Sequence, residues 1–268
     1  MEWKNIYRGI IMGISDVVPG VSGGTIAVIL GIYDRLIAAI NGLFSKEWKK
    51  HIMFLIPLAI GVGTAIFLFS HLMDWLLTYH ERPTFYFFSG LIIGVLPFLF
   101  RESEAKTTFR TYHYILLIAA IALITLLPTN ISESAVIEER TLAIYGLLFI
   151  SGIVASAAMI LPGVSGSFIF LVLGVYQTVI FSIKTLDIKV IIVVAIGIFI
   201  GIILMSKVIH YFLTHFHTAT FASIIGLVIG SIFIIFPGWA ENMGELLLCI
   251  IVFAGGLSAA YLLGKVEY

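Results

Sequence analysis

The sequence predicts an all-α polytopic membrane protein made of two inverted-topology repeats, each a re-entrant helical hairpin plus three transmembrane helices. Three observations carry this prediction: the apolar composition, an internal repeat and the lengths of the apolar segments. Of the 268 residues, 60% are hydrophobic and 11% are charged, whereas soluble domains have about 45–50% apolar and about 25% charged residues. We therefore expect an integral membrane protein.

The charges exclude several other classes of protein. Fifteen basic residues balance fifteen acidic ones, so the chain has no basic face for nucleic acid. The single cysteine, Cys249, excludes a disulfide framework and a cysteine-based metal site. We expect no cofactor, no metal and no catalytic residue.

The chain repeats itself. Residues 19–33 return as residues 162–176 at an offset of 143, and residues 77–94 return as residues 213–230 at an offset of 136. Chance matches among Ile, Leu and Val are common in apolar chains, but matched Pro, Gly, Ser, Thr and Tyr residues in the same order are not. The pattern predicts a duplication, with residues 1–130 and 131–268 as the two repeats of one integral membrane domain.

Apolar length predicts the membrane-spanning segments. A helix needs about 20 residues to cross about 30 Å of hydrocarbon. Six segments, three in each half, come near this length: residues 52–78, 84–100, 112–128, 190–213, 219–236 and 246–264.

Each half opens with an apolar pair that is broken at its centre by Pro-Gly-Val-Ser-Gly. In the first half the arms, residues 5–19 and 25–41, would reach only about 22–25 Å as helices, so we expect a re-entrant hairpin. In the second half the arms, residues 141–161 and 167–183, are just long enough to span. Two crossings per pair is therefore the competing count, and both counts return the chain to the side it entered.

Basic residues predict the orientation. With the N-terminus inside, eleven lie on the cytoplasmic side: Lys4, Arg8, Arg35, Lys46, Lys49, Lys50, Arg101, Lys106, Arg110, Lys207 and Lys265. Four lie outside: Arg82, Arg140, Lys184 and Lys189. This bias predicts a multi-pass protein of the cell membrane with both termini cytoplasmic. Because a hairpin plus three crossings is odd, the second half enters from the opposite face, an arrangement found in transporters.

The two turns are the candidate site. Backbone that leaves helix geometry at membrane depth survives only against protein or a wet cavity. Glycines allow close approach, hydroxyl residues cap helices, and the following helix points free N–H groups at the turn, which suits an anion. The candidate substrate-binding residues are Val21, Ser22, Gly23, Gly24 and Thr25 in the first turn and Val164, Ser165, Gly166 and Ser167 in the second.

Asp16 lies three residues before the first turn and has Met159 at its aligned position. An ionisable residue within a membrane is a functional candidate by default. Asp16 either carries a coupling proton or caps and pairs locally with Arg8 or Arg35. Both alternatives stay open.

Two other interpretations of the turns compete with an anion site. Pro-Gly can simply make a tight link between membrane helices, in which Gly and Pro are common. The run Gly20-Val-Ser-Gly-Gly24 also fits the G-x-S-x-G pattern of serine hydrolases. The repeat alignment offers no convincing base for such a serine, because His71 and His210 lie near segment ends.

The runs at residues 16–25 and 161–166 closely resemble the PopT family of bacterial polyprenyl-phosphate transporters, formerly a domain-of-unknown-function family. The resemblance extends over nearly the whole chain. It implies a flippase that returns undecaprenyl phosphate from the outer to the cytoplasmic leaflet for the synthesis of peptidoglycan and other envelope polymers. Membrane lipid and coupling protons would be its other partners.

Alternatives to this function are a channel or carrier for a small inorganic anion and, less favoured, an intramembrane serine hydrolase. The second turn has Ser167-Phe168 where the first has Gly24-Thr25. This difference leaves open whether the two turns play equal roles.

Overall fold

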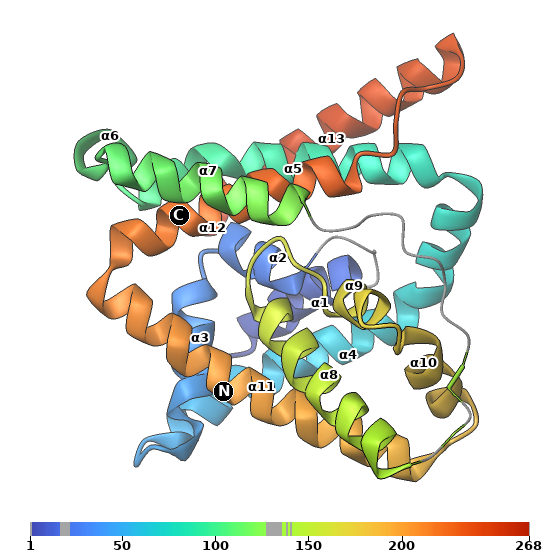
Figure 1. Ribbon diagram of the computed structural model, residues 1–268. Helices are drawn as coiled ribbons and strands as arrows, with labels where there is room; N and C mark the ends of the chain where they lie inside the picture. Colours follow the sequence, from blue (N-terminus) through green and yellow to red (C-terminus); the bar gives the residue numbers. More distant parts are fainter. Residues whose placement is uncertain (1, 17–21, 127–135, 138, 140, 268) are drawn as a thin grey trace.

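A computed structural model of the chain describes residues 2–16, 22–126, 136–137, 139 and 141–267. Over these residues the fold is all-helical, as the composition predicts (Figure 1). The first half holds α1 (Lys4–Asp16), α2 (Gly23–Ile29), α3 (Tyr33–Asn41), the 3-10 helix η1 (Gly42–Phe44), α4 (Trp48–Tyr79), α5 (Glu81–Glu102), α6 (Ala105–Thr108) and α7 (Thr111–Thr125). The second half holds α8 (Leu142–Ile160), α9 (Gly166–Val172), α10 (Tyr176–Lys184), α11 (Ile188–His215), α12 (His217–Ile235) and α13 (Met243–Glu267).

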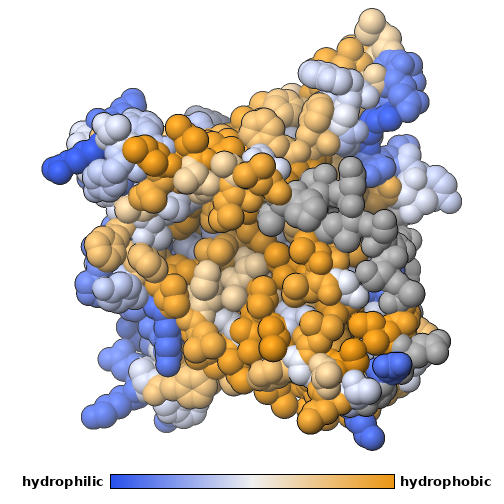
Figure 2. All heavy atoms as spheres, in the orientation of Figure 1, coloured by the Kyte–Doolittle hydropathy of each residue, from blue (hydrophilic) through white to orange (hydrophobic). Residues whose placement is uncertain are grey.

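Six of the described helices are long and apolar enough to cross a membrane: α4, α5, α8, α11, α12 and α13. Figure 2 shows hydrophobic side chains over the centre of one face and hydrophilic ones gathered toward its left and right edges. An apolar belt between two polar edges is the surface that a bilayer requires. The chain is a multi-pass membrane protein.

The predicted segments correspond to helices, with one difference in length. Four of the six lie within α4, α5, α11 and α13, and residues 219–236 match α12 except for their last residue. Residues 112–128 overlap α7, which has 15 residues. By contrast α8, predicted as the first arm of a hairpin, has the 19 residues of a candidate span. The choice between a re-entrant second hairpin and two crossings remains a prediction.

The second arm of each hairpin, expected as one helix over residues 25–41 and 167–183, is instead two short helices. The break falls at Gly31 and at Gly174, whose φ angles are 61° and 70°. After each glycine the next amide donates to the carbonyl five residues back, at 3.0 Å in both halves. This is the Schellman ending that glycine favours, and it bends the axis between α9 and α10 by 118°.

The long helices pack in pairs: α1 on α4, α8 on α11, α5 on α13 and α7 on α12. Glycine permits these close approaches. A Cβ added to Gly9 would overlap the carbonyl oxygen of Leu58, and one added to Gly61 would overlap that of Ile6. Small residues that let backbones touch are the usual basis of helix association in lipid.

The contacts between glycines recur at the repeat offsets. Gly9 against Gly61 in α1 and α4 corresponds to Gly152 against Gly197 in α8 and α11. About one helical turn further along, the glycine comes from a different helix in each half. Gly13 of α1 lies on Ala65 of α4 in the first half, whereas Gly201 of α11 lies on Ser156 of α8 in the second. The duplication seen in the sequence is thus also present in the packing.

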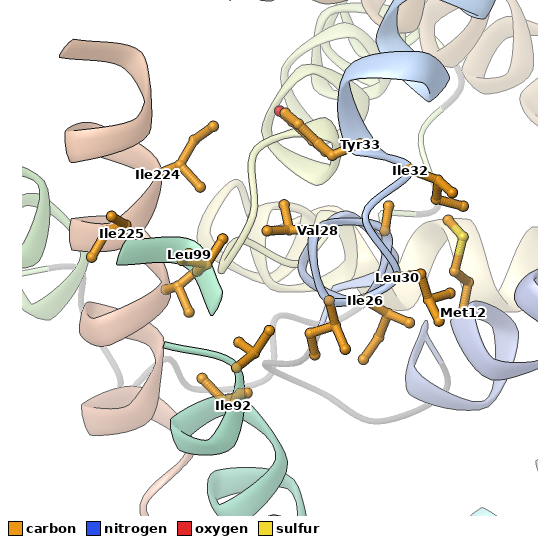
Figure 3. Close-up of a cluster of buried hydrophobic side chains, with 14 of the residues drawn as sticks. Met12, Ile26, Val28, Leu30, Ile32, Tyr33, Ile92, Leu99, Ile224 and Ile225 are labelled. Atoms are coloured by element: carbon orange, nitrogen blue, oxygen red, sulfur yellow. The ribbon is translucent and has the colours of Figure 1, made fainter. Parts of the chain in front are cut away.

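Helix α2 lies in the core. Figure 3 shows its side chains, among them Ile26 and Val28, surrounded by side chains of α1, α5 and α12: Met12, Ile92, Leu99, Ile224 and Ile225. Six of the seven residues of α2 are buried. The equivalent helix α9 has no fully buried residue, so the two hairpins occupy different environments.

We expect Gly61→Ala to destabilise the protein by about 1–3 kcal/mol, as overpacking a close contact does, because the new methyl group meets the backbone of α1. Gly63→Ala is the matched control in the same helix, since a Cβ there meets nothing within 4 Å. This control should be neutral or stabilising by up to about 1 kcal/mol. Thermal unfolding in detergent measures both, and equal melting temperatures for the two variants would contradict the packing argument.

Candidate functional site

Ser22 caps α2, as its residue type predicts. Its backbone is extended, with φ −115° and ψ 143°, and its Oγ accepts a hydrogen bond from the amide of Thr25 at 3.2 Å. The two hydroxyl oxygens of Ser22 and Thr25 are 3.0 Å apart. Both side chains are buried, each 1% exposed, so a polar pair lies inside an otherwise apolar core.

The first turn already holds a carboxyl group of the chain itself. The amide of Gly23 donates to Oδ1 of Asp16 at 2.5 Å, and Asp16 is the last residue of α1. A Cβ on Gly23 would lie 2.7 and 2.8 Å from the two carboxyl oxygens. A carboxylate at a helix start satisfies a free N–H and favours the helix dipole. The local capping role considered for Asp16 is therefore present.

The turns of the two halves touch. The amide of Gly163, in the second Pro-Gly-Val-Ser-Gly turn, donates to Oγ1 of Thr25 at 2.8 Å and to Oγ of Ser22 at 3.3 Å. Gly163 has φ +87°, and a Cβ there would lie 2.6 Å from the carbonyl oxygen of Leu227 in α12. Only glycine fits this conformation and this approach without strain.

Two further contacts join the first half to the end of α8. The hydroxyl of Tyr33 donates to the carbonyl oxygen of Ile160 at 3.2 Å. A Cβ added to Gly24 would lie 2.9 Å from the same oxygen. Sequence reasoning did not single out Tyr33 or Gly163, although both belong to the repeated run or to its copy.

The second turn is arranged differently. Ser165 precedes α9 with extended backbone but makes no side-chain cap hydrogen bond in the described structure. Its hydroxyl lies instead 2.8 Å from that of Ser167. Val164 is buried and its amide donates to the carbonyl oxygen of Leu161 at 3.3 Å. Met159 stands where Asp16 stands in the first half, so the repeat supplies no carboxylate at the equivalent position.

A pocket adjoins each turn. A cavity of about 120 Å³ is lined in part by Asp16, Gly23 and Gly24. A larger one of about 370 Å³ is lined in part by Gly166 and Ser167 and by residues of α8, α10 and α11. The two cavities share Ser156 and Met159 in their linings. Both turns therefore border space that a ligand can enter.

The candidate cations make other contacts. Nη1 of Arg8 donates to Oδ1 of Asn5 at 3.0 Å, and Arg35 forms an ion pair with Glu2. Glu2 lies beside the first residue of α1, whereas Asp16 ends that helix. The structure thus brings Asp16 to the turn and Arg35 to the opposite end of α1.

Arg82, one of the four basic residues predicted to lie outside, belongs to an ion-pair cluster. It contacts Glu241 at 2.7 Å and Glu245 at 3.2 Å. These pairs join the start of α5 to Glu241, just before α13, and to Glu245 in the first turn of α13. Val21, a candidate binding residue, lies outside the described residues.

Nucleophilic catalysis has little support at these serines. In the described part of the chain, Ser22 Oγ contacts Thr25 and Gly163, and Ser165 Oγ contacts Ser167. A catalytic serine needs a base within hydrogen-bond reach. No group of three or more His, Cys, Asp or Glu residues that could hold a metal occurs among the residues described.

Comparison with known proteins gives two relatives that cover nearly the whole chain. The chain is 44% identical over 274 residues to the "Polyprenyl-phosphate transporter" of Staphylococcus aureus, an alignment that covers 99% of this chain and 97% of the relative. It is 36% identical over 258 residues to the "Polyprenyl-phosphate transporter" of Vibrio cholerae, with 91% and 80% covered. No solved structure matches the chain.

A family model described as "Undecaprenyl phosphate translocase-like" matches residues 12–246, a range that includes both turns. Both relatives are named as transporters, not as enzymes. The resemblance noted at residues 16–25 and 161–166 is confirmed. The chain belongs to the undecaprenyl phosphate translocase-like family.

Proposed function

We propose that the protein is a lipid-phosphate flippase that returns undecaprenyl phosphate from the outer to the cytoplasmic leaflet, where it is reused for envelope polymer synthesis. The observation that carries the proposal is the contact between the two turns, in which Gly163 of one half donates to Ser22 and Thr25 of the other. Family membership supports the substrate. The proposal requires a site that both halves build and that each can expose to one side.

We further propose that the halves are inverted repeats. Figure 1 supports this, because the turn between α4 and α5 lies at the right edge and its repeat equivalent, between α11 and α12, lies at the left edge. The matching helix pairs α1 with α4 and α8 with α11 also support it. Inverted repeats that rock around a shared site are a common basis of alternating access.

The phosphate would be held by backbone amides and hydroxyls. In the second turn these are the amides of residues 164–167 and the hydroxyl of Ser165. In the first turn they are the amides of residues 21–24 and the hydroxyls of Ser22 and Thr25. The prenyl tail would stay in apolar surroundings while the phosphate crosses.

The carboxyl group of Asp16 would compete with the phosphate for the first turn. Its carboxylate accepts the Gly23 amide, which is one of the groups that phosphate would use, and two anions repel each other at this distance. Phosphate can therefore engage the first turn only when Asp16 is protonated or moves away. Proton coupling through Asp16 is one source of energy for transport, and the membrane potential acting on the lipid anion is the other.

The apolar pockets favour a lipid over a small inorganic anion as substrate. The larger pocket beside the second turn is lined almost wholly by aliphatic and aromatic side chains, which give nothing to a free phosphate or sulfate ion. Proteoliposomes should therefore take up no radiolabelled phosphate or sulfate above empty vesicles while they still flip a polyprenyl phosphate. Uptake of the free anion at the rate of the lipid would support the inorganic-anion alternative.

Gly23→Val should abolish flipping of a fluorescent polyprenyl phosphate in proteoliposomes, because the side chain would enter the space held by the Asp16 carboxyl group. Gly146→Val is the control, since a Cβ at Gly146 meets nothing within 4 Å. Thermal unfolding of both variants separates loss of function from loss of fold. Full activity of a folded Gly23→Val protein would refute the site.

Ser22→Ala and Ser165→Ala should each weaken the apparent affinity for the lipid about two- to tenfold. This range corresponds to the loss of one hydrogen bond of about 0.5–1.5 kcal/mol. Titration of the transport rate against lipid concentration measures the change. Unchanged affinity in both variants would remove these hydroxyls from the site.

Asp16→Asn should flatten the pH dependence of transport. In the wild type, deprotonation of Asp16 strengthens its hold on the Gly23 amide, so the rate should fall as pH rises, whereas the neutral amide of the variant does not titrate. Glu104→Gln is the control, because Glu104 is an exposed carboxyl group without a proposed role. Identical pH profiles for Asp16→Asn and the wild type would exclude the proton role.

A further inference from the structure

The two pockets beside the turns are related by the repeat. We call the cavity of about 120 Å³ the first-half pocket and the cavity of about 370 Å³ the second-half pocket. Positions 12, 16, 23, 24, 36, 37 and 40 line the first-half pocket, and the same positions plus 143 line the second-half pocket. A correspondence at seven positions indicates that each half carries a version of the same pocket.

The pockets differ in how far they are closed. The first-half pocket is completed by Ile160 of α8 and Ile202 of α11, and α2 beside it is almost wholly buried. The second-half pocket borders α9, which has no fully buried residue. Its lining includes Ile183 and Ala195, which are exposed on the surface and do not line the first-half pocket. The second-half pocket is therefore open to the surroundings of the helices.

The chemistry of the second-half pocket is that of a hydrocarbon site with one polar end. Aliphatic side chains such as Val179, Ile180 and Ile191 form most of the lining. Ser167, whose hydroxyl pairs with Ser165 of the turn, lies at the polar end. An apolar cavity of about 150 Å³ stays dry and takes a benzene ring, so the second-half pocket has room for more than one branched five-carbon unit.

We infer that the second-half pocket binds the isoprenyl units next to the phosphate. The assignment rests on the proposed function for the identity of the lipid. Continuity with the second turn selects this occupant, because a lipid whose headgroup lies at Ser165 and Ser167 must place its first carbons in the space that Ser167 borders. The first-half pocket is the smaller repeat counterpart of this site.

The test uses a probe without phosphate, so that it does not depend on the anion site. The full chain in nanodiscs is irradiated with a diazirine-bearing farnesol, and the labelled residues are identified by mass spectrometry. Labels should lie on α9, α10 and the pocket side of α11, at residues such as Val179, Ile180 and Ile191. Labels confined to exposed residues outside the pocket, such as Ile192 and Phe199, would overturn the inference.

Competition separates an isoprenyl site from an ordinary lipid groove. Geranylgeraniol in excess should reduce pocket labelling at least tenfold, whereas hexadecanol at the same concentration should reduce it less than twofold. Equal competition by the straight-chain alcohol would overturn the inference, because it would show that the pocket holds any hydrocarbon chain.

Adjacent residues of α11 provide matched variants. Ala195 lines the second-half pocket, whereas Ile196 is exposed outside it. Ala195→Trp should lower pocket labelling at least tenfold, and Ile196→Trp should leave it unchanged. Val179→Trp serves as a second variant from α10 should Ala195→Trp fail to fold, and equal labelling of all folded variants would contradict the assignment.

The failures of the two proposals are distinguishable. If the farnesol probe does not label the pocket of a protein that still flips polyprenyl phosphate, the pocket assignment alone is overturned. Specific labelling of the pocket in a protein that flips no polyprenyl phosphate supports an isoprenyl site and overturns the proposed function.

Discussion

Backbone amides that leave a helix inside an apolar protein must find partners, since lipid offers none. In this fold that requirement is met by joining the two halves. The amide of Gly163 in the second turn is accepted by the hydroxyls of Ser22 and Thr25 in the first, and the amide of Gly23 is accepted by Asp16. The second turn is thus stabilised by hydroxyl groups of the other half, whereas the Gly23 amide of the first turn is satisfied by a carboxyl group of its own half.

The same requirement makes the halves unequal. The first turn is capped by Ser22 and by a carboxylate, and its helix α2 is sealed in the core. The second turn has Met159 in place of that carboxylate and leads into α9, which is partly exposed and borders the larger pocket. The Gly23 amide of the first turn is bonded to the Asp16 carboxyl group, whereas the second turn borders the larger of the two cavities. An asymmetry of this kind is consistent with the alternating mechanism proposed above, in which the two halves expose a shared site in turn.

Much of this architecture was predictable from the sequence, because membrane helices are constrained chiefly by length and apolarity. Five of the six candidate spans were found in this way, but α8 was predicted as a hairpin arm and residues 112–128 as a span, where the helix has 15 residues. The capping role of Ser22 followed from its residue type. The division of each second arm was missed, although Gly31 and Gly174 stood in the repeated run as a signal for a helix ending. The partners of Ser22 and Thr25 could not be predicted, because the residue type of a hydroxyl acceptor does not indicate which distant amide donates to it.

The contact of α1 with α4 and the corresponding contact of α8 with α11 differ in which helix supplies the smaller residue. In one copy glycine belongs to the first helix at position 13 and the larger Ala65 to the second, whereas in the other copy Ser156 and Gly201 reverse the assignment. What the two copies share is therefore a small combined side-chain bulk at this contact, not the identity of either residue. Selection on such a sum lets paired positions drift together, so two copies can diverge in sequence while the distance between their helices stays the same.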